Sequence, residues 1–293
     1  MTSVRSGVGQ RRQERSKTMK SHMITGGGGI RLHVVETGDP SGQPILFLHG
    51  FSQCSLAWTR QLNSDLAGTF RLLALDLRGH GLSGKPAEGY SDSRLWAEDV
   101  NAALSALELD HPVLCGWSYG PLVILDYVRH YGEDDISGVS FIGGVTKLGS
   151  EEAAAVLTEG FLGLLPGFFS TDAQESVHAL DSLVRMCFSH ELSAEDRYLM
   201  LGYNVCVPPQ VRQALFSRSF DNDDLLPRLH KPVMIAHGVD DAVVKPTVID
   251  QQMARIPHAT VRMMANAGHA CFWDEAATYN RYLREFVDSL IEP

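Results

Sequence analysis

Gly116-Trp117-Ser118-Tyr119-Gly120 is the most informative segment of this 293-residue chain. It follows the apolar pattern Val113–Cys115 and precedes a helical pattern that begins near Pro121. Glycines two residues before and two residues after a serine allow a sharp strand-to-helix turn, where backbones crowd and only small neighbours fit. Such a turn places the Ser118 hydroxyl at the tip of a sheet and at a helix N-terminus, whose dipole favours a developing negative charge. The pattern indicates a nucleophilic serine, and the simpler alternative is an N-cap serine in an ordinary strand–helix turn.

The sequence around this turn alternates short apolar runs with helical stretches. Short, largely apolar runs are typical of strands buried on both faces of a parallel sheet. The strand candidates are Ile30–Glu36, Pro44–Leu48, Phe70–Leu77, Val113–Gly116, Val139–Gly143, Pro232–Ala236 and Thr260–Met264. Between them, apolar residues recur at helical spacing, as from Trp96 to Leu107 and from Tyr279 to Leu290. The chain is therefore predicted to be an α/β protein with a mostly parallel, doubly wound sheet.

One region interrupts this alternation. Residues 147–229 contain no convincing strand, and helices are expected there at 150–165, 172–189, 193–203 and 208–219. An insertion of about 80 residues between two strands is far longer than a usual crossover connection. We therefore expect a helical cap or lid on an α/β core made of residues 23–146 and 230–293. The apolar side chains of the insertion either cover the substrate or form the insertion's own core. They include Phe161, Leu162, Leu164, Leu165, Phe168 and Phe169.

The charge distribution narrows the range of partners. The formal net charge is −10 at pH 7, but residues 1–22 carry six basic side chains and one acidic side chain, so the remainder carries −15. We expect no nucleic acid partner, because phosphate binding needs a basic surface. An acidic body also disfavours a strongly anionic substrate. Residues 1–22 are predicted to be a disordered leader, with an upstream start before Met19 or Met23 and a transit peptide as alternatives.

The cysteine content and the hydropathy of the chain indicate in which cellular compartment the protein is expected. The five cysteines are odd in number and include no Cys-x-x-Cys pair. Reduced thiols in the cytoplasm are therefore expected, and a zinc site is not. No run of about 18 apolar residues is present, so no membrane-spanning helix is expected. A core of this size needs neither a metal nor a disulfide for its stability.

Two further motifs follow strand candidates and would complete a catalytic triad. His237-Gly238-Val239-Asp240-Asp241 supplies a carboxylate of the kind that orients an imidazole and stabilises it when protonated. Asp240 and Asp241 compete for this role, because adjacent residues at a strand end point in different directions. Ala267-Gly268-His269 follows the last strand candidate and supplies the imidazole. The chain order serine, aspartate, histidine is the order that this arrangement of strands requires. The histidines expected to be structural are His49, His80 and His237.

A further motif, His49-Gly50-Phe51, ends the strand candidate Pro44–Leu48. Its glycine frees the following backbone N–H group to point into the site. We expect the backbone N–H groups of Phe51 and Tyr119 to form the oxyanion hole. Donors of this kind typically stabilise an acyl-transfer transition state by about 3–4 kcal/mol each.

Together these motifs resemble those of the α/β-hydrolase superfamily. The matching segments are HGF at 49–51, DLRGHGLSGKP at 76–86, GWSYG at 116–120, HGVDDAVV at 237–244 and NAGHACFWDE at 266–275. The resemblance runs from about residue 30 to 291 and implies an α/β-hydrolase fold with an inserted helical lid and no cofactor. It also implies a Ser118–Asp241–His269 triad, since the acid in such families is the last residue of H-G-x-x-D. Asp76–Ser83 is a structural signature of the superfamily, and Pro121, where many relatives have glycine, is tolerated in a first helical turn.

The resemblance also reduces the number of enzyme activities that are expected for the chain. A serine in the turn separates the chain from haloalkane dehalogenases and epoxide hydrolases, which use aspartate there, and the missing H-G-G-G run separates it from hormone-sensitive-lipase-like esterases. A carboxylic ester hydrolase that acts on a small or medium, apolar substrate through an acyl-enzyme is therefore expected, as a monomer or homodimer. The alternatives are a lactonase (including acyl-homoserine lactones), a perhydrolase or cofactor-free haloperoxidase, a carbon–carbon bond hydrolase, and a ligand receptor with little turnover. Candidate pocket residues near the motifs, for which core packing is an equal alternative, are Cys54, Trp58, Trp117 and Trp273.

Overall fold

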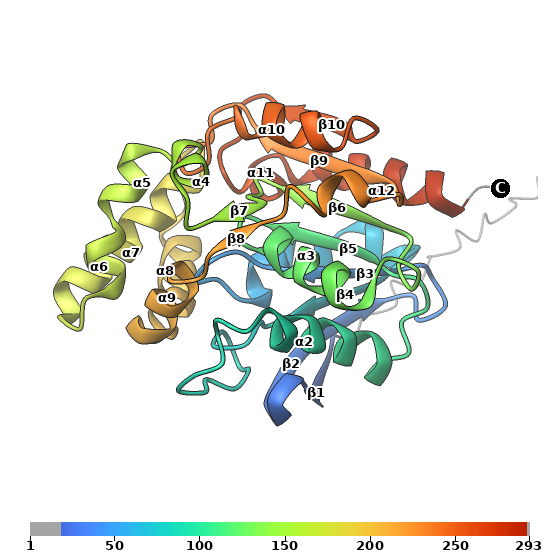
Figure 1. Ribbon diagram of the computed structural model, residues 1–293, viewed down its shortest axis with the longest axis horizontal. Coiled ribbons are helices and arrows are strands. Elements are labelled where there is room, and N and C mark those ends of the chain that lie inside the picture. The colour runs from blue at the N-terminus through green and yellow to red at the C-terminus, as the bar shows by residue number, and fades with distance from the viewer. Residues whose placement is uncertain (1–18, 292–293) are drawn as a thin grey trace, which may run out of the picture.

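The computed structural model describes residues 19–291 and is built on one eight-stranded sheet (Figure 1). The strand order is β1-β2-β4-β3-β5-β6-β9-β10. β2 is antiparallel to both of its neighbours, β1 and β4, whereas all other neighbouring strands of this sheet are parallel. The bounds are β1 Lys20–Thr25, β2 Arg31–Gly38, β3 Pro44–Leu48, β4 Arg71–Leu75, β5 Val113–Trp117, β6 Gly138–Ile142, β9 Val233–Gly238 and β10 Thr260–Met264. The prediction of a mostly parallel sheet is confirmed.

The central strands are buried along their whole length. Every residue of β3, β5, β6 and β9 is buried, which explains why these segments read as short, largely apolar runs. β10 lies at the edge of the sheet and buries only its last residue, Met264. Because β3, β5, β6, β9 and β10 run parallel, their carboxyl ends share one edge of the sheet, and the loops that follow them are neighbours.

Two groups of helices pack against the sheet. α2 Ser93–Ala106 and α3 Gly120–Tyr131 contact each other and lie in front of the sheet in Figure 1. A second group of mutually contacting helices consists of α1 Thr59–Leu62, α11 Cys271–Asp274 and α12 Ala276–Ile291. α10, Val248–Arg255, connects β9 to β10. The apolar side of α12 is packed as its spacing predicts, since the buried residues include Tyr279, Leu283, Phe286 and Val287.

Residues 147–229, called the insertion below, lie between β6 and β9 at one end of the sheet (Figure 1). Its helices are α4 Glu151–Ala155, α5 Glu159–Gly163, α6 Leu165–Phe169, α7 Ala173–Met186, α8 Ala194–Val205 and α9 Pro209–Phe216. The single helix predicted over 150–165 is wrong. Ser150 and Thr158 each start a new short helix, because their hydroxyls accept the backbone N–H groups of Ala153 and Phe161.

The expectation that the insertion contains no strand is also wrong. β7 Lys147–Leu148 and β8 Phe220–Asp221 pair antiparallel at the two ends of the insertion. Strands of two residues leave no alternating pattern in the sequence, so the pattern of apolar residues could not reveal them.

The predicted leader over residues 1–22 extends too far. Lys20, Ser21 and His22 belong to β1 and pair with Glu36, Val35 and Val34 of β2. β1 is an edge strand with no buried residue and no continuous apolar run, which is why the sequence did not identify it. Residues 1–18, the rest of the predicted leader, lie outside the described residues.

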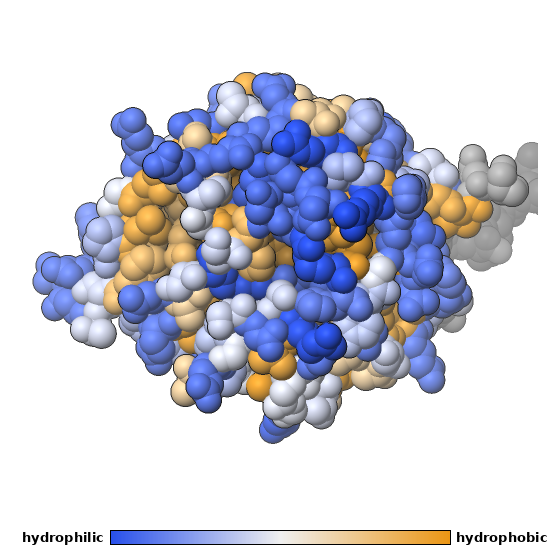
Figure 2. All heavy atoms as spheres, viewed as in Figure 1, coloured by the Kyte–Doolittle hydropathy of each residue, from blue (hydrophilic) through white to orange (hydrophobic). Residues whose placement is uncertain are grey.

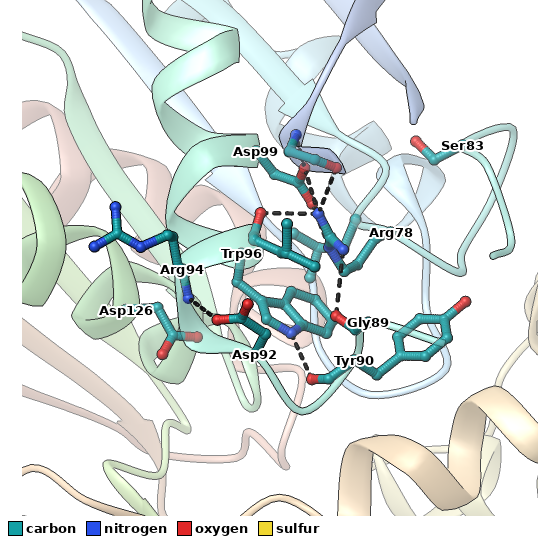
Figure 3. Close-up of polar contacts among 12 residues, drawn as sticks. Arg78, Ser83, Gly89, Tyr90, Asp92, Arg94, Trp96, Asp99 and Asp126 are labelled. Atoms are coloured by element: carbon teal, nitrogen blue, oxygen red, sulfur yellow. Dashed lines mark hydrogen bonds and ion pairs between the residues drawn. The ribbon is translucent and has the colours of Figure 1, made fainter. Parts of the chain in front are cut away.

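The Asp76–Ser83 signature holds loops together, in agreement with its predicted structural role. The Arg78 guanidinium donates to both carboxylate oxygens of Asp99, at 2.7 and 2.8 Å, and to the carbonyls of Gly27, Gly89 and Leu95 (Figure 3). Both charged side chains are buried, with exposed fractions of 1% and 0%. A buried ion pair is sustained only when its remaining hydrogen-bonding groups are also satisfied, as they are for Arg78.

None of the helices in residues 19–291 combines the length and the apolar character that crossing a bilayer requires.

Candidate active site

Ser118 occupies a strained turn between β5 and α3. Its φ is +58°, a left-handed conformation that non-glycine residues rarely adopt. The turn is held in place from both sides, because the Ser118 N–H donates to Ile142 O at 2.9 Å and its carbonyl accepts the N–H of Val145 at 3.1 Å. The predicted strand–turn–helix context of Ser118 is therefore present.

The two flanking glycines are required by close backbone approach. A Cβ atom on Gly116 would lie 2.6 Å from the backbone of Gly120 and Pro121, and one on Gly120 would lie 2.5 Å from Leu48 O. Neither space admits a side chain, so both ends of the turn depend on glycine. Pro121 lies in the first turn of α3, where its missing N–H group costs no helical hydrogen bond.

Asp241 and His269 form a buried hydrogen-bonded pair at the carboxyl ends of β9 and β10. The Nδ1 atom of His269 lies 2.8 Å from Asp241 Oδ2, while Asp241 Oδ1 accepts the backbone N–H groups of Val243 and Val244 at 2.8 Å each. Asp240 is exposed, so the structure distinguishes between the two neighbouring aspartates. The carboxylate contact implies that Nδ1 of His269 carries the proton and that Nε2 is free to accept one.

The environment of Asp241 favours its ionised form. Burial raises the pKa of this carboxyl, but the opposing effects of His269 and His237 are larger together, and the pKa lies well below its usual range. His237 contributes because its Nε2 atom lies 3.2 Å from Asp241 Oδ2. His237 was expected to be structural, and this contact places it beside Asp241.

Ser118 and His269 line one cavity, which has a free volume of about 20 Å³. Both residues lie in the cavity wall, and among the described residues no hydrogen bond joins Ser118 Oγ to the His269 ring. Catalytic hydrogen bonds of this kind often tighten only when substrate is bound. The remaining lining residues include Gln53, Leu183, Cys187 and Val243, none of which the sequence indicated.

The backbone N–H groups of Phe51 and Tyr119 are available as donors. Within residues 19–291 neither group donates a backbone hydrogen bond, although Phe51 is buried at 6% and Tyr119 at 3% exposure. Gly50 brings the two loops together, because a Cβ atom there would lie 2.8 Å from Ser118 Cβ. Unpaired buried amides are rare and mark positions where an acceptor is expected to bind.

Of the four candidate pocket residues, only Trp117 lines the cavity that contains Ser118 and His269. The expectation for Trp58 is wrong: it is fully buried and stacks against Phe47 and Phe272, with ring centroids 4.7 and 4.3 Å apart. Trp273 packs under the Arg60 guanidinium at 4.6 Å and is not part of the cavity lining either. Cys54 is buried outside the lining as well. Core packing, the stated alternative, describes all three.

A buried carboxylate that the sequence analysis missed ties the His269 loop to the insertion. Asp274 Oδ2 accepts the backbone N–H of Gly268 at 2.7 Å and that of Ser189 at 2.9 Å. The Ala270 N–H donates to Cys187 O at 2.7 Å, so the residues on both sides of His269 are fixed to the chain after α7. The position of His269 is therefore coupled to the position of the insertion.

Two of the other histidines are buried and uncharged. Burial lowers the pKa of His49 to about 4 and that of His80 to about 3. His49 Nε2 accepts the N–H of Leu77, which fits its expected structural role. No cluster of three His, Cys, Asp or Glu side chains suited to a metal ion occurs in residues 19–291, and all five cysteines are free thiols.

Comparison with known proteins gives the family. The model of the α/β hydrolase fold family matches residues 43–276. The crystal structure of an esterase, RhEst1, from Rhodococcus sp. ECU1013 has a TM-score of 0.87 and 33% sequence identity, and covers 92% of this chain and 99% of its own. The AB hydrolase superfamily protein YisY of Bacillus subtilis (strain 168) is 28% identical over 279 residues, which are 92% of this chain and 99% of the relative. The bifunctional esterase/perhydrolase DCH of Acinetobacter calcoaceticus is 27% identical over 288 residues, which are 91% of this chain and 99% of the relative. The chain therefore belongs to the α/β-hydrolase fold family, among relatives that are named as hydrolases and esterases.

Proposed function

We propose that this chain is a serine hydrolase that cleaves a carboxylic ester of a small or medium, apolar substrate through an acyl-enzyme. The proposal rests on one observation: the strained Ser118 and His269, whose ring is hydrogen-bonded to the buried Asp241, line the same cavity. A nucleophile, a base and a group that orients the base are the three parts that acyl transfer by serine requires.

In the proposed cycle, His269 Nε2 takes the Ser118 proton as Ser118 Oγ bonds to the carbonyl carbon of the ester. The resulting oxyanion accepts hydrogen bonds from the backbone N–H groups of Phe51 and Tyr119. Collapse of this intermediate breaks the bond to the alcohol oxygen, which receives the proton from His269. Water then repeats the sequence on the acyl-enzyme and releases the carboxylic acid, so the chain's own residues supply every proton transfer.

The insertion supports a small or medium substrate and acts as a lid in this proposal. Phe161 lines the site, and it packs with Phe168 and Phe216, so the insertion's apolar core extends to the cavity wall. The free volume of about 20 Å³ is far below the range of about 300–1,000 Å³ typical of pockets for drug-sized ligands. A cytoplasmic location and a monomer or homodimer remain part of the proposal.

The second candidate is a perhydrolase activity, in which hydrogen peroxide replaces water in the attack on the acyl-enzyme. The similarity to the relative named as a bifunctional esterase/perhydrolase favours it. It uses the same serine, so it is distinguished by its product: a peracid, measured by oxidation of a halide in the presence of peroxide and acetate.

Turnover of p-nitrophenyl acetate and butyrate by wild type and Ser118→Ala tests the proposal. The variant is expected to remain folded and to lose turnover, because the other nucleophilic side chain of the lining, Cys187, is a buried thiol whose pKa is raised by burial, so it stays protonated. Ser52→Ala is the control, since Ser52 is a buried serine with a similar positive φ, +61°, that lies outside the cavity lining. Retained turnover in folded Ser118→Ala contradicts the proposal, and a single burst without steady turnover in wild type favours the ligand receptor instead.

A further inference from the structure

Two cavities meet at Ser118. The first, described above, contains His269 and Trp117, and the second, with a free volume of about 30 Å³, has a largely different lining. The linings share four residues, Phe51, Ser118, Phe161 and Val243. An ester bound at Ser118 has two arms, so each cavity is available to one of them.

The two cavities differ in which of the proposed catalytic groups line them. His269 lines only the first cavity, and Tyr119, whose backbone N–H is a proposed oxyanion donor, lines only the second. When the ester bond breaks, the alcohol oxygen must lie next to His269, because that imidazole supplies its proton. The alcohol arm therefore belongs in the first cavity, and the acyl arm, on the other side of the carbonyl carbon, belongs in the second.

The walls of the second cavity are apolar. Side chains found there and not in the first cavity are Val145, Leu148, Ala153, Leu157, Phe216 and Val244. The one charged residue of the lining, Lys147, has its Nζ 2.8 Å from a carboxylate oxygen of Glu152 and 2.8 Å from one of Asp223. Its charge is thus already paired within the protein, and it offers no free counter-ion to a charged acyl group. An alkyl or aryl acyl group gains binding energy here for each carbon that it buries.

The first cavity is smaller and chemically mixed. Its lining includes the side chains of Gln53, Cys187 and His269 together with Leu183. A short alcohol, or one with a polar atom near the ester, suits these walls better than a long alkyl chain.

We propose that this enzyme hydrolyses esters of apolar acyl groups with small alcohols, and that Leu157 limits the length of the acyl group. This inference rests on the proposed serine hydrolase function and assigns the two arms of its substrate. Leu157 is well placed as a limit because its backbone pairs with Val244 in an isolated bridge, which holds its side chain in the wall of the second cavity. The side chain can therefore be shortened while the backbone contact that positions the wall is kept.

Leu157→Ala and Leu183→Ala form a matched pair, because they remove the same atoms from the second and the first cavity respectively. Each variant is assayed on two series of esters. p-Nitrophenyl acetate, butyrate, hexanoate and octanoate vary the acyl arm, and methyl, butyl and hexyl acetate, followed by proton release, vary the alcohol arm. Leu157→Ala is expected to raise the octanoate-to-acetate ratio of kcat/KM by about tenfold and to change the hexyl-to-methyl ratio by less than about twofold. Leu183→Ala is expected to do the reverse.

Both leucines are buried, so thermal unfolding of each variant accompanies the assay. Ala153→Leu is a companion variant that opens no void: it narrows the second cavity and is expected to lower the octanoate-to-acetate ratio by about tenfold. Exchanged effects of the two leucine variants, or unchanged ratios in all three folded variants, overturn the inference. Turnover that persists in Ser118→Ala, or its absence from wild type with both series, instead overturns the proposed function and with it the assignment of the arms.

Discussion

Replacing Asp241 with asparagine tests the role assigned to the acid. Asp241 Oδ1 holds the N–H groups of Val243 and Val244 at 2.8 Å, and asparagine keeps an oxygen for these two bonds. Its amide nitrogen then faces His269 Nδ1, where the carboxylate oxygen lay at 2.8 Å. Two donors cannot share that contact, so the imidazole must place its proton on Nε2, the atom that has to accept the Ser118 proton.

The magnitude follows from the lost charge. An imidazolium and a carboxylate about 4 Å apart attract each other by roughly 4 kcal/mol at an effective dielectric constant of 20. Each 1.36 kcal/mol corresponds to about a factor of ten in rate, so Asp241→Asn is expected to lower kcat by about 10³-fold. The wrong tautomer adds to this loss, whereas KM is expected to change only a few-fold, because Asp241 does not line the cavity.

The assay is steady-state hydrolysis of p-nitrophenyl butyrate, with thermal unfolding to show that the variant is folded. Asp240→Asn is the matched control, since it makes the same chemical change one residue away on an exposed side chain and is expected to retain wild-type kcat. A folded Asp241→Asn within tenfold of wild type, or an Asp240→Asn that is equally impaired, would refute the reasoning.

Three further predictions concern stability and the support of the site. Asp274→Ala leaves the N–H groups of Gly268 and Ser189 without their acceptor. It is expected to lower the free energy of unfolding, measured in urea, by about 2–4 kcal/mol, and to lower kcat more than it raises KM in steady-state assays. An unchanged kcat contradicts the coupling of the His269 loop to the insertion. Arg78→Met leaves the Asp99 carboxylate buried without its ion-pair partner. The variant is expected to lower the free energy of unfolding in urea by about 3–5 kcal/mol, with kcat/KM of the folded fraction unchanged. A loss below about 1 kcal/mol argues against the structural role of this ion pair. Burial raises the pKa of Asp76, but it is lowered to about 2 by the hydrogen bond from His33, by the charge that His49 gains below about pH 4, and by two backbone N–H groups. The contribution of Asp76 to stability, roughly 2 kcal/mol, is therefore present above pH 4 and is lost as the pH falls through 2. Asp76→Asn is expected to remove this part of the acid dependence of the free energy of unfolding, and an identical dependence in variant and wild type excludes it.

Local sequence patterns were sufficient where the structure depends on local geometry. The turn at Ser118 needs a strand, two glycines and a helix in immediate succession, and all of them are adjacent in the sequence. The buried strands were likewise recognisable, because burial on both faces leaves an apolar run such as Pro44–Leu48. Choosing Asp241 over Asp240 required the family pattern, since both residues follow the same strand.

Features that depend on distant parts of the chain were not predictable in this way. Proximity in sequence to a motif suggested Trp58 and Trp273 as pocket residues, but the direction of a side chain is set by packing, and both point into the core. Leu183 reaches the cavity because the fold brings α7 of the insertion beside Ser118 and His269, and no pattern near Leu183 signals this. Asp274 acts through backbone N–H groups of other segments, which have no sequence signature.

Peptide mapping after reaction with a fluorophosphonate ester shows whether Ser118 is the nucleophile. The account predicts one adduct per chain, located on the peptide that contains Ser118, and none in Ser118→Ala; modification of Asp241→Asn is expected to be slower by a factor similar to its loss in kcat. A stoichiometric adduct on another residue, or an unmodified Ser118 in folded protein that still hydrolyses esters, would contradict it.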